Sequence, residues 1–362
     1  MGIKSINKLL KEQAPDAFFT LGIDTFSGKR IAVDANNWMY TMMYKTNALH
    51  YRSMDTIVMM NKKESIKKWV ECAIEFIVTL MINKVTPVFV FDGTSLPEKE
   101  KEQARRREDR LKRKEKLKDL LDKQDKLVSV HELKSAVINN NDIGSEDIEY
   151  MINILECLGI PCIVAKADAE KLCSMMCREG IVAAVYSTDT DNYVYGCPLL
   201  ITGRSKERKN GYIAYDCVRY DRIVESLELS HEQFVDLCIM CGCDYNKNIK
   251  GIGPSKSLTL IRNHGLIHKL PKNYDTKELL YVKCRNIFKT ERSDIDDDLE
   301  VVVLEESEID QLIEKYDLKV NKKQIMMAYE GSRECDSGSI EELELGMNDD
   351  YSGRCEFAFC DE

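Results

Sequence analysis

The sequence predicts an α/β fold in which a mostly parallel central sheet is flanked by helices. Short, strongly apolar segments alternate with longer segments that carry apolar residues at helical spacing. Such alternation is typical of parallel sheets, because parallel neighbours must be joined by a crossover, usually a helix. The chain has 362 residues, of which 44% are hydrophobic. This is enough for one large domain or two modest domains with a buried core.

The first strand, helix and strand are predicted between residues 30 and 93. Residues 30–35 form a short apolar segment that contains Asp34, and residues 86–93 form a second one that contains Asp92. Between them, residues 65–82 place apolar side chains at helical spacing around Trp69. We therefore expect a strand, a helix and a parallel strand in this order.

The alternation continues to about residue 190 and is followed by a hairpin and helices. We expect helices at 148–158 and from about Ala169, and strands at 160–165 and 181–186. Two further strands, at 199–202 and 211–216, flank a predicted polar turn at 203–211. Helices are then expected at 231–241, at 308–316 and at 322–329. Another is expected to begin at the Gly251–Ser255 segment and to run to about His264. After Gly331, Gly, Ser and acids predominate, which predicts a tail of low order.

The net charge of -10 is unevenly distributed along the chain. Residues 331–362 hold ten Asp or Glu against two Arg, a balance of -8, which leaves -2 for the first 330 residues. Within these, residues 101–118 hold ten Lys or Arg against four acids. Because the local field attracts a polyanion, the acidic total does not exclude a nucleic-acid ligand.

The composition also argues against several classes of protein. No apolar stretch reaches the roughly 18 residues that a membrane span needs, and the first residues lack the apolar core of a signal peptide. The fourteen cysteines form no pair of C-x-x-C motifs with zinc-type spacing. We therefore expect an intracellular protein whose cysteines are reduced and mostly buried.

Seven acidic residues stand, with few exceptions, where a predicted strand ends or a turn begins. They are Asp34, Asp92, Asp168, Glu170, Asp189, Asp191 and Asp244. In an open parallel sheet the ligand crevice lies at the carboxyl ends of the strands, so acids at several such ends converge. Concentrated carboxylates repel one another unless a cation is bound. The pattern therefore predicts a cation site.

Three kinds of cation site can be compared on the Asp189-Thr-Asp191 motif. An EF-hand loop starting at Asp189 needs Gly at position six and Glu at position twelve, where the chain has Val194 and Leu200. A sugar-nucleotide D-x-D site uses one metal and leaves the other acids without a role. A pair of Mg²⁺ ions about 4 Å apart accounts for all seven, because such ions need several carboxylates. A two-metal site of this kind predicts a phosphodiester substrate.

Two further segments are candidates for phosphate contacts. Lys99 and Arg106 lie seven positions apart on one face of a predicted helix that follows Asp92, where a cation could hold the scissile phosphate. A basic run of this kind is also typical of a solvated helix face. The Gly251–Ser255 loop, which precedes a predicted helix, offers close backbone approach and free N–H groups, although it can equally be a tight turn.

The order of these motifs resembles that of the flap endonuclease family, the structure-specific 5′ nucleases of the XPG type. The resemblance runs from the starting Met-Gly-Ile to about Tyr329. It includes Ile-Ala-Val-Asp34-Ala, Val-Phe-Val-Phe-Asp92-Gly, Leu158-Gly-Ile-Pro161, Ala167-Asp-Ala-Glu170, Ser187-Thr-Asp-Thr-Asp191, Gln233-Phe-Val-Asp-Leu-Cys-Ile, Gly242-Cys-Asp-Tyr245 and Ile249-Lys-Gly-Ile-Gly-Pro254. One departure is Asp168, which stands where the family usually has Glu.

The resemblance implies a PIN-like nuclease core and specific roles for individual residues. The seven acids would hold two Mg²⁺ or Mn²⁺ ions, and Lys99 and Arg106 would be catalytic residues at the foot of a helical arch. Bases would stack on Tyr40. A helix-two-turn-helix at about 231–265 would grip duplex phosphates with help from K⁺. The residues implied in DNA binding are Gly2, Tyr40, Lys99, Arg106, Gly251, Gly253, Ser255 and Lys256.

The expected function is structure-specific cleavage of DNA at 5′ flaps, in replication, repair or recombination. The related alternatives are a 5′ to 3′ exonuclease, a Holliday-junction resolvase and a non-catalytic junction binder. We expect nuclease regions at 1–93 and 146–330, the arch at 94–145 and an acidic tail at 331–362. The resemblance implies a nuclear protein, and we expect a monomer. Recruitment by a sliding clamp is doubtful, because no clear clamp-binding box is evident near the end of the chain.

Overall fold

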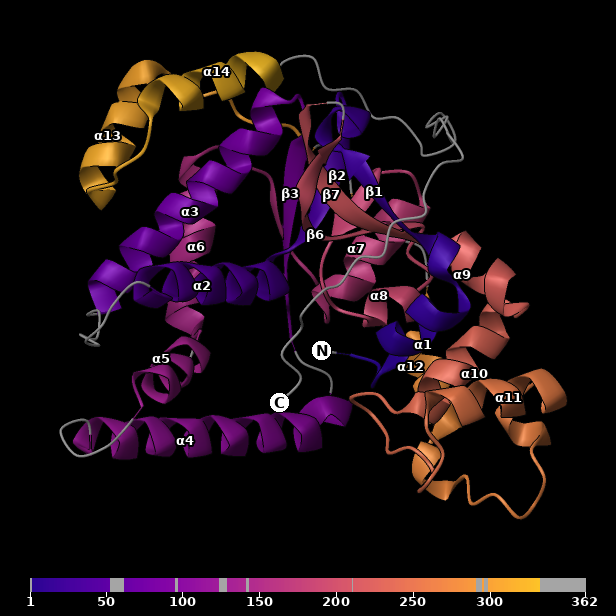
Figure 1. Ribbon diagram of the computed structural model, residues 1–362. Coiled ribbons are helices and arrows are strands. Elements are labelled where there is room, and N and C mark those ends of the chain that lie inside the picture. The colour runs from indigo at the N-terminus through magenta and orange to yellow at the C-terminus, as the bar shows by residue number, and fades with distance from the viewer. Residues whose placement is uncertain are drawn as a thin grey trace.

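The computed structural model describes most of the chain, apart from Met1, the last thirty residues and several short internal segments (Figure 1). The described residues are 2–52, 62–94, 97–123, 129–140, 143–209, 211–290, 295 and 299–332. The tail predicted after Gly331 therefore lies almost entirely outside them. In the described part of the chain, no helix combines the length and apolar character needed to cross a membrane.

The centre of the fold is a seven-stranded mixed sheet with the strand order β1-β7-β6-β5-β2-β3-β4. The strands are β1 (Phe18–Gly22), β2 (Arg30–Asp34), β3 (Thr86–Phe91), β4 (Cys162–Val164), β5 (Ala184–Tyr186), β6 (Leu199–Lys209) and β7 (Tyr212–Arg219). The strands from β6 to β4 are parallel to one another, whereas β7 pairs antiparallel with both β6 and β1. The predicted α/β fold with a mostly parallel sheet is confirmed.

Helices connect these strands and cover the sheet. The first group is α1 (Ile6–Gln13), α2 (Ala35–Arg52), α3 (Lys62–Ile82), α4 (Glu100–Asp122), α5 (Val130–Asn139), α6 (Ser145–Cys157) and α7 (Ala169–Arg178). The second is α8 (Asp191–Val194), α9 (Tyr220–Leu227), α10 (His231–Cys241), α11 (Pro254–His264), α12 (Tyr281–Phe288), α13 (Glu306–Tyr316) and α14 (Lys322–Ser332). Helix α4, which carries the basic run, extends away from the sheet (Figure 1).

Both faces of the sheet are covered because its central strands are apolar on both sides. All six residues of β3 are buried, and successive side chains point to opposite faces. Val88 and Val90 belong to a hydrophobic cluster with residues from α1, α7 and α10, whereas Phe89 and Phe91 belong to a cluster with residues from α2, α3 and α6. The result is a sheet between two helical layers, as the near-continuous apolar strands predict.

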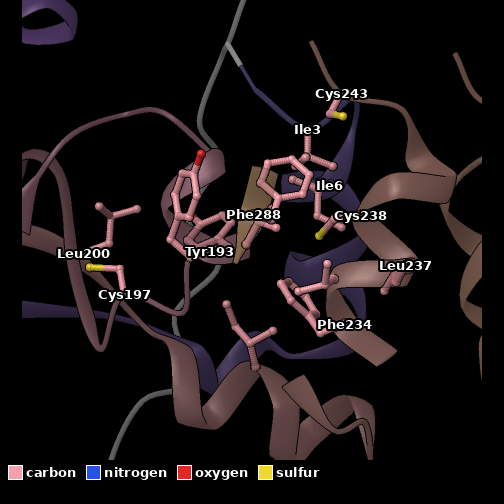
Figure 2. Close-up of a cluster of buried hydrophobic side chains, with 14 of the residues drawn as sticks. Ile3, Ile6, Tyr193, Cys197, Leu200, Phe234, Leu237, Cys238, Cys243 and Phe288 are labelled. Atoms are coloured by element: carbon pink, nitrogen blue, oxygen red, sulfur yellow. The ribbon is translucent and has the colours of Figure 1, made fainter. Parts of the chain in front are cut away.

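The first of these clusters joins the N-terminal segment to the helices that follow the sheet. Figure 2 shows Ile3 and Ile6 beside Phe234 and Cys238 of α10, with Phe288 of α12 close to them. The beginning of the chain is thereby packed against α10, and Lys4 N–H donates a hydrogen bond to the carbonyl of Gly242 over 3.0 Å. This packing holds the N-terminus beside the loop that carries Asp244.

Two details of the sequence prediction are wrong. The segment 203–211, predicted as a polar turn, belongs largely to an extended hairpin, because β6 continues to Lys209 and pairs with β7 as far as Tyr212. Polar side chains are compatible with a strand that leaves the body of the sheet, since backbone pairing there needs no buried face. The strands predicted at 160–165 and 181–186 are shorter, at Cys162–Val164 and Ala184–Tyr186.

Candidate functional site

The acidic residues are placed by the ends of the parallel strands. Asp34 is the last residue of β2, and Asp92 directly follows β3. The parallel register pairs Asp34 with Val90, so the two strands end side by side. Asp168 is the residue before α7, in the connection that follows β4. The predicted convergence of acids at one edge of the sheet follows from this topology.

A close approach of two backbones brings Asp168 to Asp92. A Cβ atom at Gly93 would lie only 1.8 Å from the carbonyl oxygen of Ala165, so no other residue type fits there without a shift. The N–H of Gly93 donates to the carbonyl of Ala167 over 2.7 Å. Oδ1 of Asp92 accepts the N–H of Ala169, at the start of α7, over 2.8 Å. Asp92 therefore caps the helix that carries Glu170.

The loop after β5 is tied to β2 by side-chain hydrogen bonds. The hydroxyl of Ser187 donates to Oδ2 of Asp34 over 2.8 Å and accepts the N–H of Asp189 over 3.0 Å. Oδ1 of Asn37, in α2, accepts both the N–H and the hydroxyl of Thr188, over 3.1 and 2.9 Å. These bonds hold Asp189 and the following Asp191 beside Asp34.

Crowding of the carboxylates is visible in their acid–base properties. Burial, together with the charges of Asp92 and Asp189, raises the pKa of Asp34 to about 7. Burial and the neighbouring acids also raise the pKa values of Asp191 and Glu170 well above the usual range, although Lys99 opposes the shift of both groups. Buried like charges of this kind are the environment in which a cation is strongly favoured.

Two basic side chains reach the acids: Lys99, the residue directly before α4, and Arg106, within α4. Nζ of Lys99 lies 2.8 Å from Oδ1 of Asp168 and 3.4 Å from Oε1 of Glu170. Burial alone would lower the pKa of Lys99, but these carboxylates raise it above its usual value. Nη2 of Arg106 lies 2.7 Å from Oδ2 of Asp244. The cations predicted to face the metal site therefore form ion pairs with three of its acids.

The N-terminal segment also enters this site. Gly2 has a φ of +87°, and a Cβ atom added to it would lie 2.3 Å from Oδ1 of Asp189 and 2.7 Å from Oδ1 of Asp191. The N–H of Ile3 donates to the hydroxyl of Thr190 over 2.7 Å. Glycine is required at position 2 because the main chain lies directly against the carboxylates.

The chemistry of the acidic group suits hard divalent cations, which prefer carboxylate oxygen ligands. Oδ1 of Asp191 is buried and has no hydrogen-bond partner within the part of the chain that the structure describes. As the side chains stand, no three His, Cys, Asp or Glu groups of the described residues are arranged to hold a metal ion. Lys99 and Arg106 instead neutralise the acids, so their ammonium and guanidinium groups must move if ions bind there.

The structure brings together most of the residues predicted from sequence. A cavity of about 100 Å³ is lined by Asp92, Lys99, Arg106, Asp168 and Asp244, among others. Asp34, Glu170, Asp189 and Asp191 interact electrostatically with this group, and Gly2 touches the last two.

The remaining predicted DNA-binding residues occupy other surfaces. Tyr40 is half-buried on α2, where it packs against the hydrophobic cluster on that side of the sheet. Gly251, Gly253, Ser255 and Lys256 are exposed around the start of α11. Nζ of Lys256 donates to the carbonyl of Gly251 over 3.3 Å, which closes the loop.

Tyr245 and Glu102 contact the predicted site residues, although the sequence analysis did not predict either of them. The hydroxyl of Tyr245 donates to Oδ2 of Asp168 over 3.0 Å, and Nζ of Lys99 lies 5.6 Å from the centre of the Tyr245 ring. Glu102 lines the cavity and accepts a hydrogen bond from Arg106. The adjacency of Tyr245 to Asp244, and the four-residue spacing of Glu102 and Arg106, are the sequence signals that could have identified them.

Comparison with known proteins agrees with this fold. Residues 1–113 match the model of the XPG N-terminal domain, and residues 159–244 match the model of the XPG I-region. The solved structure of flap endonuclease-1 from Methanococcus jannaschii aligns with a TM-score of 0.62 at 22% identity, over 87% of this chain and 96% of that one. The catalytic core of Rad2 in complex with a DNA substrate aligns with a TM-score of 0.58 at 18% identity, over 91% and 100%. The chain thus has an α/β nuclease-core fold.

Similarity to known sequences identifies the family to which the chain belongs. It is 30% identical to flap endonuclease 1 of Heterostelium pallidum over 321 residues, which cover 86% of this chain and 80% of that protein. The chain belongs to the flap endonuclease family. It is also 34% identical to flap endonuclease 1-2 of Paramecium tetraurelia over 73% of its own length, but this match spans only 65% of the Paramecium protein.

Proposed function

We propose that this protein is a divalent-metal-dependent endonuclease that cuts DNA at 5′ flaps, leaving 3′-hydroxyl and 5′-phosphate ends. The observation that carries the proposal is the meeting of seven carboxylates with Lys99 and Arg106 at one edge of the sheet. Concentrated acids suit metal ions, and cations beside them suit a phosphate. Both features are needed for hydrolysis of a phosphodiester.

The acids proposed as ligands of two Mg²⁺ or Mn²⁺ ions are Asp34, Asp92, Asp168, Glu170, Asp189, Asp191 and Asp244. Bound ions would lower the pKa of a coordinated water and stabilise the leaving oxygen. Lys99 and Arg106 are the proposed catalytic side chains: released from Asp168 and Asp244, they would bind the oxygens of the scissile phosphate. Ser187 and Asn37 keep the loop of Asp189 and Asp191 in place.

Three surfaces are proposed to bind the rest of the DNA without reading its sequence. The basic helix α4 and the helix α5 belong to the proposed arch at 94–145, beside which the single strand would pass. Tyr40 would stack on a base, and Gly2 would contact the DNA next to the acids. The exposed Gly251, Gly253, Ser255 and Lys256 would hold duplex phosphates at the start of α11, with K⁺ bound in this loop.

The proposed organisation and setting follow the family. The nuclease core would comprise residues 1–93 and 146–330, with a helix-two-turn-helix at about 231–265. Helices α10 and α11 pack together there, which supports this assignment. We propose a monomer that acts on nuclear DNA in replication, repair or recombination.

The proposal is tested by measuring cleavage of labelled 5′-flap, nicked and four-way DNA substrates with and without Mg²⁺. Wild-type protein is expected to cut the flap substrate fastest and only when the metal is present. Asp189→Asn and Asp191→Asn are expected to lower the rate by at least about a hundredfold, because each removes a negative charge from the metal site. DNA affinity measured with Ca²⁺ in place of Mg²⁺ serves as the folding control.

The same substrates separate the alternatives. Equal or faster cleavage of four-way junctions would favour a resolvase, and progressive removal of nucleotides from a nick would favour an exonuclease. A wild-type protein that binds junctions but leaves every substrate uncut would refute the enzymatic proposal and indicate a junction-binding protein.

A further inference from the structure

An acidic side chain occupies the cavity in which the proposed function places a phosphate. Glu102 lines the cavity of about 100 Å³ together with Asp92, Lys99, Arg106 and Asp244. Its side chain is 20% exposed, and it is not among the seven proposed metal ligands. A carboxylate there repels the DNA backbone, so it weakens binding unless it contributes in another way.

The contacts of Glu102 indicate what it contributes. Its Oε1 atom accepts a hydrogen bond from Nε of Arg106 over 3.1 Å, and the same guanidinium binds Oδ2 of Asp244 through Nη2 over 2.7 Å. The guanidinium is thus bonded through Nε to Glu102 and through Nη2 to Asp244. When Nη2 leaves Asp244 for a phosphate, as the proposed function requires, the bond from Nε to Glu102 still restricts the rotation of this planar group.

Glu102 also controls the neighbouring arginine. Nη2 and Nε of Arg105 bind Oε1 and Oε2 of Glu102 over 2.6 and 2.9 Å, while Nη1 of Arg105 binds Asp109 over 2.7 Å. The hydrogen bonds from Arg105 and Arg106 hold the pKa of Glu102 below its usual value, against the effect of burial. Glu102 therefore stays ionised and directs Arg105 along the exposed side of α4.

We propose that Glu102 is a positioning residue, which fixes the guanidinium of Arg106 with its Nη edge directed into the cavity where the scissile phosphate binds. This inference rests on the proposed function. Glu102 touches neither the substrate nor the reacting atoms in this role. Its negative charge lowers DNA affinity, and the orientation that it gives Arg106 raises the rate of the bound complex.

A simpler explanation for Glu102 is its place in the first turn of α4. Acids there stabilise a helix by interacting with its N-terminal N–H groups, whatever else they contact. Glu100 is in the same first turn but is exposed. Glu100→Gln is therefore a matched control, because it removes the same charge from the same turn without altering the contact with Arg106.

The test compares Glu102→Gln and Glu100→Gln in kcat and in DNA affinity. Glutamine keeps the length of the side chain but accepts a weaker hydrogen bond from Arg106. We expect Glu102→Gln to lower kcat on the flap substrate about tenfold, since the acceptor of this hydrogen bond loses its charge and the bond becomes weaker. In Ca²⁺, its Kd for the same DNA should fall two- to threefold, because a negative charge has been removed. Glu100→Gln should leave kcat within about twofold.

A double-mutant cycle with Arg106→Ala shows whether the effect passes through Arg106. If it does, Glu102→Gln changes kcat less than about twofold when Arg106 is already absent. An undiminished tenfold loss in that background, weaker DNA binding, or an equal effect of Glu100→Gln would overturn the inference. The inference would also be overturned if Glu102→Gln had the kcat of wild type while wild type cuts normally. That result would leave the proposed function intact. Failure of wild type to cut any substrate overturns both.

Discussion

The phenolic hydroxyl of Tyr245 donates a hydrogen bond to Oδ2 of Asp168 over 3.0 Å. The other oxygen of the same carboxylate, Oδ1, lies 2.8 Å from Nζ of Lys99. The carboxylate of Asp168 is thus fixed from both sides. Outer partners of this kind orient a metal-binding carboxylate and tune its affinity.

Replacement of Tyr245 by Phe should raise the Mg²⁺ concentration needed for half-maximal cleavage about tenfold, since the carboxylate of Asp168 loses one of its two anchors. At saturating Mg²⁺ the rate should return to within a few-fold of wild type, because the aromatic ring and Asp168 itself remain. The measurement is a Mg²⁺ titration of the cleavage rate.

Tyr329→Phe is the matched control for this experiment. Tyr329 is also buried, and its hydroxyl donates to the carbonyl of Leu158 over 2.7 Å, in the hydrophobic cluster on the other face of the sheet. It should lose similar stability without any change in the Mg²⁺ requirement. If Tyr245→Phe and Tyr329→Phe give the same Mg²⁺ midpoint, the role assigned to Tyr245 is wrong.

Replacement of Gly2 by Ala should lower the cleavage rate about tenfold. The added Cβ would lie 2.3 Å from Oδ1 of Asp189 and 2.6 Å from Oγ1 of Thr190, so either the N-terminal segment or the acidic loop must move. Small-to-large changes at tightly packed positions displace their neighbours in this way. Single-turnover cleavage of the flap substrate measures the effect.

Gly28→Ala separates this contact from backbone strain. Gly28 has a φ of +75°, similar to that of Gly2, but a Cβ atom there would meet nothing within 4 Å. Both substitutions carry the cost of a positive φ, and only the substitution at Gly2 disturbs the acids. Equal losses of activity in the two variants would contradict the proposed contact of Gly2 with the site.

The metal-free protein should become less stable as the pH rises from about 4 to 7. Burial and the charges of Asp92 and Asp189 raise the pKa of Asp34 to about 7 from an unfolded value of 3.8. Within this window the unfolded chain releases a proton that the folded protein retains, so raising the pH favours unfolding. The stability that protonated Asp34 contributes is fully present below the unfolded pKa of 3.8 and is lost as the pH rises above the folded pKa of about 7.

Asp34→Asn removes this penalty while keeping the hydrogen bonds, since an amide can accept from the N–H of Asn37 and donate to Ser187. The difference in Tm between pH 5 and pH 8, measured in EDTA, should therefore be smaller in Asp34→Asn than in wild type by about 3–5 °C. Glu170 and Asp191 contribute in the same direction and remain in both proteins. An identical pH dependence of Tm would show that Asp34 is ionised throughout.

The sequence by itself predicted the fold class and which acidic residues would lie together. Near-continuous apolar strands such as residues 86–91 indicated a sheet covered on both faces, and the position of Asp34 and Asp92 at strand ends indicated where they would meet. Both inferences depend on local pattern and on a general property of parallel sheets, so no knowledge of distant contacts was needed. The segments that contain Lys99, Arg106 and the Gly251 loop could be predicted from the sequence for the same reason.

Tertiary structure alone decided which side chains complete the site. Tyr245 reaches Asp168 across 77 residues of sequence. Gly2 reaches Asp189 because Ile3 and Ile6 pack against α10 and the N–H of Ile3 donates a hydrogen bond to Thr190. The contact of Glu102 with Arg106 is local in the sequence. That Arg106 lies in the site follows only from its contact with Asp244, which is 138 residues away. Such contacts depend on how separate elements pack, and this packing leaves no periodic signal in the sequence. The same packing raises the pKa of Asp34, because burial and neighbouring charge exist only in the folded chain.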